Sequence, residues 1–336
     1  MDFQNKQWYN ITANLVFTRG WQDTPSPFGR LPQHAQTLLP EKVWKMGRNS
    51  SGMYVEFYTN SSSISVKWLL KDEDFGELNF NVCSYSGIDL FCYHQKKWRF
   101  VVAASALAKD NNLEILSNLP KKQRLFRLYF PFRNEIDNIA IGIDENSQLS
   151  WVDPQYIPQI IYYGSSIIHG SCTSRAGNGI TSLLGRKFNT PVVNLGFSGA
   201  AKLELEMAKL LLELDSLFYI IDPLPNCDTV LVAANLEPFL RCLCSNKKDI
   251  PVFLLTDANR RGAWIHPQQV KAHREKRLKA KEIVLTLQQE FPQLHFIDMA
   301  KSMGSDFEGT VDGIHPDQLG VTRFTNFLIK KLQKHL

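Results

Sequence analysis

The second half of the chain alternates short apolar runs with stretches of helical periodicity. Strands that alternate with helices in this way form a parallel sheet, joined by right-handed crossovers and covered by helices on both faces. The pattern predicts a three-layer α/β/α sandwich with flavodoxin-like topology. The predicted strands lie at 159–163, 192–195, 217–222, 250–256 and 294–298, and the predicted helices lie near 177–188, 202–213, 229–243, 268–290 and 317–334.

The first half shows a period of two instead. Val55 and Phe57 alternate with polar neighbours, and similar alternation recurs at short intervals with almost no helical periodicity. Regularly spaced short strands of this kind predict an all-β sandwich such as a jelly roll. The stretch 145–148 is the most linker-like, so we predict a β-domain over 1–150 and an α/β domain over 151–336. The predicted β-strands are 53–59, 63–68, 78–83, 88–93, 98–103, 125–132 and 139–143.

Composition changes this picture little. The chain has 336 residues, 44% of them hydrophobic and 21% charged, with a net charge of +5. These values are typical of a globular protein large enough for two domains. A basic excess lies at 271–281 within a predicted helix. We interpret it as a solvated helix face, because nucleic-acid binding requires a broader basic surface, and we expect no nucleic-acid partner.

The N-terminal residues lack the pattern of a signal peptide, and no apolar run is long enough to span a bilayer. We therefore expect a cytoplasmic protein that does not bind membranes. Six scattered cysteines suggest reduced thiols rather than a disulfide framework. Cys242 and Cys244 lack the spacing of a zinc site, and we expect no metal.

Candidate chemistry begins directly after the first α/β strand. Gly164, Ser165 and Ser166 follow it and form a turn that presents a hydroxyl at the carboxyl edge of the sheet. A hydroxyl is a poor nucleophile unless a base takes its proton and a third group orients that base. Asp312 and His315 supply both groups, because they stand three residues apart on one predicted turn.

Two further turns can supply hydrogen-bond donors at the same edge. Gly196 follows the strand at 192–195, and Asn226 follows the strand at 217–222. Acyl transfer builds negative charge on a carbonyl oxygen and requires fixed donors aimed at that oxygen. We expect the N–H groups of Ser166 and Gly196 and the side-chain amide of Asn226 to form this oxyanion hole.

The order Gly-x-Ser, Gly, Asn and Asp-x-x-His resembles the four blocks of the SGNH (GDSL-type) hydrolase superfamily over about residues 158–336. The resemblance implies that Ser166, Gly196, Asn226 and the Asp312/His315 pair are the residues that define the family. Ser165 stands where many members have Asp. The sequence at 87–91, Gly-Ile-Asp-Leu-Phe, is similar to the Gly-x-Asp-Leu-Tyr signature of SGNH proteins with an N-terminal β-domain, with phenylalanine in place of tyrosine.

These residues predict a serine esterase that works through an acyl-enzyme and needs no cofactor. The resemblance extends to carbohydrate esterases, which implies a small acyl ester or an acylated sugar as substrate. It extends also to acyltransferases, in which an acceptor alcohol replaces water. A third hypothesis is a non-catalytic glycan-binding protein, and the intact set of candidate residues argues against it. The sequence does not indicate an oligomeric state.

Several neighbouring residues have alternative roles. Ser165 competes with Ser166 as the nucleophile, although the resemblance assigns that role to Ser166. His169, on the first turn after the serine, and His266, in the loop after the fourth strand, are candidate substrate contacts. Asp312 can alternatively cap the last helix, for which Asp317 is the better candidate.

Overall fold

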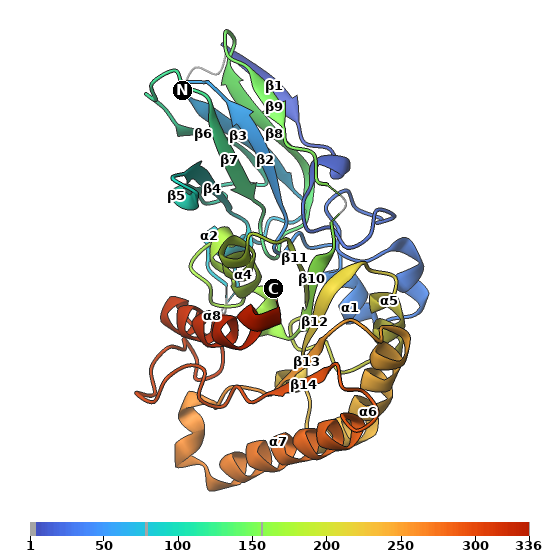
Figure 1. Ribbon diagram of the computed structural model, residues 1–336. Coiled ribbons are helices and arrows are strands. Elements are labelled where there is room, and N and C mark those ends of the chain that lie inside the picture. The colour runs from blue at the N-terminus through green and yellow to red at the C-terminus, as the bar shows by residue number, and fades with distance from the viewer. Residues whose placement is uncertain (1–4, 78–79, 156, 336) are drawn as a thin grey trace. The chain divides into compact units, whose positions relative to one another are not determined.

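The computed structural model describes residues 5–77, 80–155 and 157–335 (Figure 1). The chain forms two compact units, and each includes a short segment from the other half of the sequence. The first unit comprises Met1–Gln33, Arg48–Tyr156 and Ser174–Asn178. The second comprises His34–Gly47, Ile157–Thr173 and Gly179–Leu336. The stretch 145–148, interpreted as a linker, therefore lies inside the first unit.

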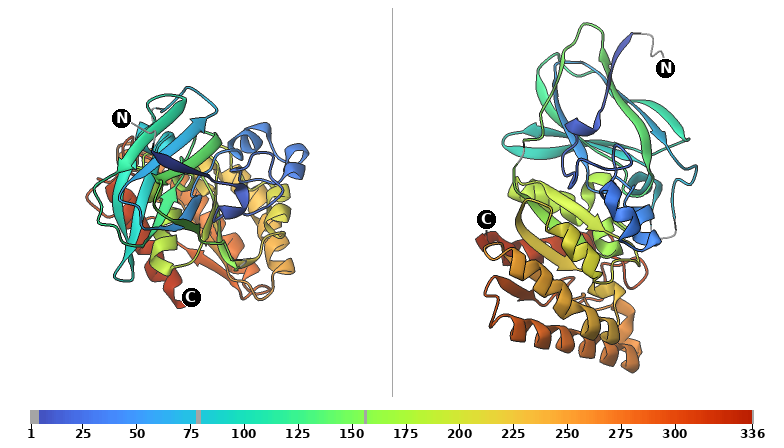
Figure 2. Two further views of the ribbon diagram at one scale, coloured as in Figure 1. Left: turned by 90° about the horizontal axis from the view of Figure 1, so that it is seen from above. Right: turned by 90° about the vertical axis from the view of Figure 1, so that its right-hand side faces the viewer.

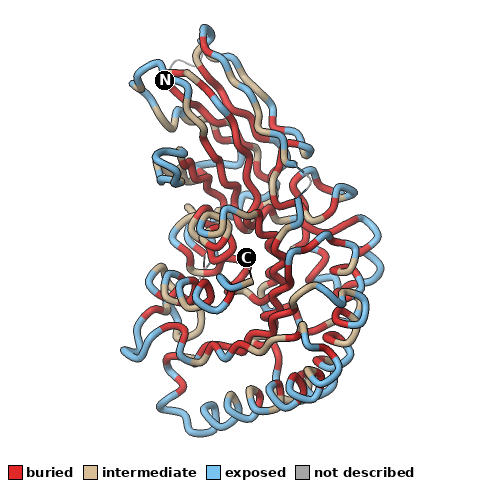
Figure 3. Tube along the Cα trace, in the orientation of Figure 1, coloured by how far each residue is buried: buried red, intermediate tan, exposed pale blue. Residues whose placement is uncertain are grey.

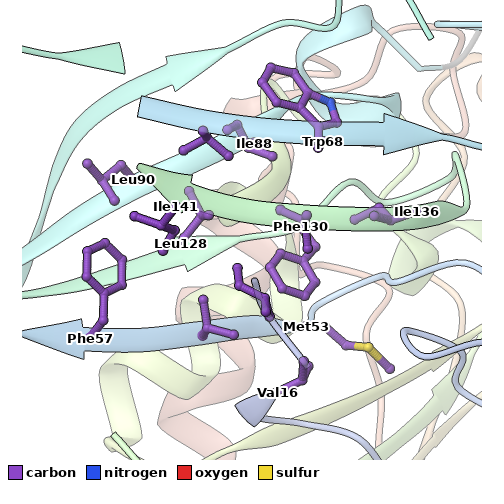
Figure 4. Close-up of a cluster of buried hydrophobic side chains, with 14 of the residues drawn as sticks. Val16, Met53, Phe57, Trp68, Ile88, Leu90, Leu128, Phe130, Ile136 and Ile141 are labelled. Atoms are coloured by element: carbon purple, nitrogen blue, oxygen red, sulfur yellow. The ribbon is translucent and has the colours of Figure 1, made fainter. Parts of the chain in front are cut away.

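The first unit contains two antiparallel sheets, and the predicted all-β sandwich is confirmed. One sheet has the order β1-β8-β3-β6 and the other has the order β5-β4-β7-β2-β9. Alternate residues of both sheets, among them Phe57, Trp68 and Leu128, fill a common core (Figure 4). The strands are β1 (Lys6–Asn10), β2 (Tyr54–Thr59), β3 (Ile64–Leu70), β4 (Ile88–His94), β5 (Lys97–Ala104), β6 (Asp110–Leu116), β7 (Arg124–Tyr129), β8 (Ile136–Asp144) and β9 (Leu149–Trp151).

One predicted strand of this unit is wrong. Within the stretch 78–83, residues 78 and 79 lie outside the described residues, and Val82 begins helix α2 (Val82–Tyr85). The Asn81 side chain caps this helix by accepting a hydrogen bond from the Ser84 N–H at 3.1 Å. A local cap of this kind competes with strand pairing. Strand β6 was not predicted, because its sequence DNNLEIL lacks a clear alternation.

The second unit is built on a five-stranded parallel sheet with the order β11-β10-β12-β13-β14. Numbered along the unit, this order is 2-1-3-4-5, the flavodoxin-like topology that the sequence predicted. All five predicted strands form, with ends shifted by at most two residues at either side. They are β10 (Gln159–Gly164), β11 (Val192–Gly196), β12 (Ser216–Asp222), β13 (Val252–Leu255) and β14 (Leu294–Ile297).

Helices cover both faces of this sheet (Figures 1 and 2). One face carries α4 (Ile180–Phe188) and α8 (Gln318–Leu332), and the other carries α5 (Leu205–Leu211), α6 (Thr229–Asn246) and α7 (Pro267–Leu287). The strands are accordingly buried along their length (Figure 3), which explains their continuous apolar sequences. The remaining α-helices are α1 (Glu41–Met46) and α3 (Ser166–His169). The 3₁₀ helices are η1 (Ala13–Leu15), η2 (Gln33–Thr37), η3 (Ala176–Asn178), η4 (Leu224–Asn226), η5 (Arg261–Ile265) and η6 (Gln333–His335).

All six cysteines are free thiols. Among the helices of the described ranges, none has both the length and the apolar character that a membrane span requires.

Candidate active site

The two serines after β10 have different surroundings. Ser165 is fully buried and caps α3, with its Oγ accepting a hydrogen bond from the Ile167 N–H at 3.4 Å. Ser166 is the first residue of α3 and is partly exposed. Gly164 permits this sharp turn, because a Cβ there would lie 2.6 Å from Cγ1 of Ile168. The turn therefore directs one hydroxyl into the protein and leaves the other accessible.

Ser166, His315 and Asp312 form one continuous hydrogen-bonded array. Ser166 Oγ lies 2.8 Å from His315 Nε2, and His315 Nδ1 lies 2.6 Å from Asp312 Oδ2. The three residues come from the two ends of the unit, 149 positions apart for the serine and the histidine. This is the geometry in which an imidazole can take the serine proton while a carboxylate stabilises the resulting charge.

Backbone donors fix the carboxylate of this array. Asp312 Oδ1 accepts hydrogen bonds from the N–H groups of Ile314 at 3.0 Å and His315 at 2.8 Å. Gly313 makes the tight turn possible with a φ of +84°. Burial alone would raise the pKa of Asp312, but the hydrogen bonds from His315 and Ile314 hold that pKa below its ordinary value. Asp312 is therefore a carboxylate at neutral pH.

The cap of α8 is Asp317, as preferred above. Its side chain accepts a hydrogen bond from the Gly320 N–H at 2.9 Å. We call residues 309–317 the Asp-His loop. The hydrogen bonds that the Asp312 oxygens accept come from Ile314 and His315 within this loop, and not from the described residues of α8.

The role predicted for Gly196 needs correction. Strand β11 includes Gly196, and its N–H is already donated to Asn194 Oδ1 at 2.9 Å. A Cβ at this position would lie only 2.2 Å from the backbone nitrogen of His169. Gly196 is thus required for the close packing of β11 against α3, and its N–H is not available to a substrate oxygen.

The next glycine has the properties that Gly196 lacks. Gly199 lies in the turn after β11, which we call the glycine turn (residues 197–201). It is exposed and has a φ of +61°. Within the described ranges, its N–H makes no hydrogen bond. Sequence reasoning missed this residue, although the triplet Phe-Ser-Gly at 197–199 was visible after the strand.

Asn226 contacts the same turn. It ends η4 and is half-buried, and its Nδ2 donates to the carbonyl oxygens of Phe197 at 3.3 Å and Ala201 at 3.1 Å. The structure therefore brings Asn226 to the glycine turn. Both amide hydrogens are directed to backbone oxygens in the free protein, and the bond to Phe197 is the longer one.

His169 does not have the exposure expected of a substrate contact. It is fully buried, and its Nδ1 lies 3.1 Å from Ser198 Oγ in the glycine turn. Asn194 acts in a similar way, since its Nδ2 donates to the Ile168 carbonyl at 2.7 Å. Both side chains join α3 to β11 and its following turn. The predicted contact role of His169 is therefore wrong, because the first turn of α3 points this ring into the protein.

An aromatic cavity lies beside the Asp-His loop. The Arg261 N–H donates to the Gly313 carbonyl at 2.8 Å, which fixes η5 against that loop. Residues of η5 line a cavity of about 230 Å³. On its wall the rings of Trp264 and Phe307 pack edge to face, with their centroids 6.3 Å apart. Both rings are exposed, by 66% and 59%. The other lining residues are Asn259, Arg260, Ala263, Val270, His273 and Arg277.

His266 is exposed at the junction of η5 and α7 and does not line this cavity. Its contact with substrate stays a prediction. Trp264, which lines the cavity, stands two positions from His266 in the same loop and was not predicted to do so.

Two family models match the chain. One describes the GDSL-like lipase/acylhydrolase family and matches residues 158–333, and the other describes the N-terminus of SGNH-hydrolase-type esterases, named GxDLY, and matches residues 6–149. The chain belongs to the GDSL-like lipase/acylhydrolase family. By its family the chain is an SGNH-type ester hydrolase. The predicted superfamily and the predicted enzyme class are confirmed.

Solved structures similar to this chain include a protein from Bacteroides ovatus described as a GDSL-like lipase. It is 25% identical, both chains are covered to 98%, and the TM-score is 0.92. A salicylyl-acyltransferase from a tetracycline biosynthetic pathway is 17% identical, with 98% of each chain covered and a TM-score of 0.77. A family two carbohydrate esterase from Clostridium thermocellum is 12% identical, with 85% of this chain and 94% of that chain covered and a TM-score of 0.59. The last two share the fold. No curated protein matches this chain.

Proposed function

We propose that this protein hydrolyses a small acyl ester through a covalent acyl-enzyme on Ser166. The observation that carries the proposal is the array of Ser166, His315 and Asp312, with contacts of 2.8 and 2.6 Å. His315 Nε2 takes the hydroxyl proton while Oγ attacks the acyl carbonyl carbon, and it then returns that proton to the leaving alcohol. Water attacks the acyl-enzyme by the same proton transfers and releases the carboxylic acid.

The oxyanion hole in this proposal consists of the N–H groups of Ser166 and Gly199 and the amide of Asn226. Gly199 replaces Gly196, because the residue is exposed and its N–H makes no hydrogen bond within the described ranges. Asn226 takes part by giving up its long bond to the Phe197 carbonyl, 3.3 Å, for a shorter bond to the charged oxygen. A charge-assisted hydrogen bond is stronger than the neutral one that it replaces.

We propose an acylated sugar as the substrate class. The exposed rings of Trp264 and Phe307 flank a cavity next to the Asp-His loop, and polar side chains such as Asn259 and Arg260 complete its lining. Binding sites commonly combine aromatic walls with a few polar groups that fix the ligand's orientation. The carbohydrate esterase of similar fold was solved in complex with cellohexaose.

Acyl transfer to an acceptor alcohol is the second candidate. The observation that favours it is the similar fold of the salicylyl-acyltransferase, whose chain is covered to 98%. The two reactions use the same acyl-enzyme and differ in whether the site excludes water. A glycan-binding protein without activity would not need the aligned serine, histidine and carboxylate, so we do not adopt it.

Product analysis tests these proposals. The protein is incubated with p-nitrophenyl acetate, with longer p-nitrophenyl esters and with acetylated xylose, each with and without added sugar alcohols. Free acid from all productive incubations supports hydrolysis, whereas an acylated sugar alcohol as the main product supports transfer. Release of neither product, with Ser166 unlabelled by a fluorophosphonate, would overturn both candidates. Turnover of the p-nitrophenyl esters with no cleavage of acetylated xylose would overturn the proposed substrate class alone.

A further inference from the structure

The basic stretch 271–281 was interpreted as a solvated helix face, but Lys276 within it is buried. Most of α7 is exposed along its outer side (Figure 3), but Lys276 is only 4% exposed. The neighbouring Arg274 and Glu275 are exposed, and Lys276 is the one charged residue of α7 that is buried. A buried ammonium group is costly unless hydrogen bonds and an opposite charge compensate it. The contacts of Lys276 should therefore indicate what its burial achieves.

Three acceptors surround the Lys276 ammonium, one for each of its hydrogens. Nζ donates to the Leu224 carbonyl at 2.9 Å and to the Cys227 carbonyl at 3.0 Å. The third partner is Asp257, whose Oδ2 lies 3.1 Å away and 3.0 Å from Nδ1 of His273. Leu224 begins η4, and Cys227 directly follows it. Lys276 therefore forms hydrogen bonds at both ends of η4, the short helix that carries Asn226.

This helix has little internal support. It is three residues long, and its own backbone bonds are those from the N–H of Asn226 to Pro223 and from the N–H of Cys227 to Leu224. A single 3₁₀ turn is a weak element, because few hydrogen bonds hold it. A donor that stabilises an oxyanion must nevertheless be fixed before the reaction, since its benefit depends on avoiding reorganisation.

We infer that Lys276 is a positioning residue that holds η4 so that the Asn226 amide is aimed at the oxyanion. It acts through Asn226 and does not contact the substrate. Asp257 supports it by compensating its charge. The inference rests on the proposed function, in which Asn226 is an oxyanion donor. Nothing in the sequence pattern marks Lys276, because it lies within a run of solvated basic residues more than forty positions after Asn226.

A double-mutant cycle tests the inference with p-nitrophenyl acetate as substrate. Asn226→Ala should lower kcat by roughly 100- to 1000-fold with little change in KM, because the lost bond forms chiefly in the transition state. Lys276→Met should lower kcat by roughly 10- to 100-fold, again with little change in KM. In the Asn226→Ala background, the same lysine substitution should lower kcat by less than about threefold. Lys271→Met, an exposed lysine of the same helix, is the matched control and should leave both constants unchanged.

Equal losses of kcat from Lys276→Met in the two backgrounds would overturn the inference, because the lysine would then act independently of Asn226. An effect confined to KM would also overturn it. Circular dichroism checks that each variant is folded, and Lys276→Gln, which keeps a donor in the same place, replaces the methionine variant if that one does not fold. The proposed function fails separately, if the wild type neither hydrolyses the ester nor reacts with a fluorophosphonate at Ser166.

Discussion

At the scale of single residues, the adjacent Ser165 and Ser166 should respond differently to a fluorophosphonate probe. The probe should label the wild type and Ser165→Ala but not Ser166→Ala, because only Ser166 Oγ contacts His315. Ser165→Ala removes the helix cap to Ile167 and should cost about 1 kcal/mol of unfolding free energy. Mass spectrometry of the labelled peptide gives the modified position, and a label on Ser165 would refute the assignment.

Gly196 at the end of β11 and Gly199 in the glycine turn should differ in their tolerance of a side chain. Gly196→Ala places a methyl group 2.2 Å from the His169 nitrogen and should lower the unfolding free energy by about 3 kcal/mol or more. At Gly199, the nearest atom within reach is Nζ of the flexible Lys42, 3.3 Å away. Gly199→Ala should therefore cost only the strain of its positive φ, about 1–2 kcal/mol. Denaturant unfolding of both variants checks this, and equal losses would contradict it.

The sequence was sufficient for the Ser166, His315 and Asp312 assignments to be made as hypotheses, because each stands in a motif of fixed spacing. The motif does not tell whether Gly196 or Gly199 supplies an N–H to the proposed oxyanion hole. The answer depends on the strand continuing one residue beyond the apolar run and on the bond from Gly196 to Asn194. A motif states which residue types occur, but not which N–H a neighbouring side chain already occupies.

At the scale of elements, α7 is joined to the loop after β13 by the buried pair of Lys276 and Asp257. Burial alone would raise the pKa of Asp257, but His273 and Lys276 lower it below its ordinary value of about 3.9. A carboxylate with a depressed pKa stabilises the fold fully above its unfolded pKa, and this contribution is lost as pH falls through the lower folded pKa.

Asp257→Asn should therefore destabilise the protein at neutral pH by about 3–5 kcal/mol, because it leaves the buried lysine without its counter-charge. The difference from wild type should persist down to about pH 4 and shrink at lower pH, as the wild-type carboxylate becomes protonated. Urea unfolding across this pH range measures it. A difference that stays constant to pH 2 would show that packing, and not charge, is responsible.

The order of elements in the second unit could be predicted because each strand is a continuous apolar run and each helix shows the helical periodicity of apolar residues. The β-unit was harder. Asn81 caps a helix that begins at Val82 within an apolar stretch, and β6 pairs with β3 despite its polar sequence. Both outcomes depend on partners distant in sequence or on a local cap, and alternation alone does not contain them.

At the scale of the whole molecule, each unit includes one segment from the other half of the sequence, 174–178 in the first unit and 34–47 in the second. The Gly-x-Asp-Leu-Tyr-like motif explains the first of these two exchanged segments. Asp89 is fully buried and accepts hydrogen bonds from Nη1 of Arg175 at 2.6 Å and from the N–H of Gly177 at 2.9 Å. Residues 174–178 therefore belong to the first unit. Phe91, in place of the signature tyrosine, faces the Arg175 guanidinium at 5.4 Å, a contact that needs no hydroxyl.

The second exchanged segment makes the predicted boundary near residue 150 testable. Residues 34–47 belong to the second unit and include the buried side chains of Val43 and Trp44. A fragment that begins at 151 lacks them and should lose about 4 kcal/mol of apolar burial, which corresponds to roughly 10 °C in melting temperature for a domain of this size. The matched control joins residues 34–47 to the same fragment through a flexible Gly/Ser linker, which leaves the segment free to reach its native position. Calorimetry should show the higher melting temperature for the joined form. Equal melting temperatures would mean that the α/β unit folds without its N-terminal segment and that a single cut near 150 separates two independent domains.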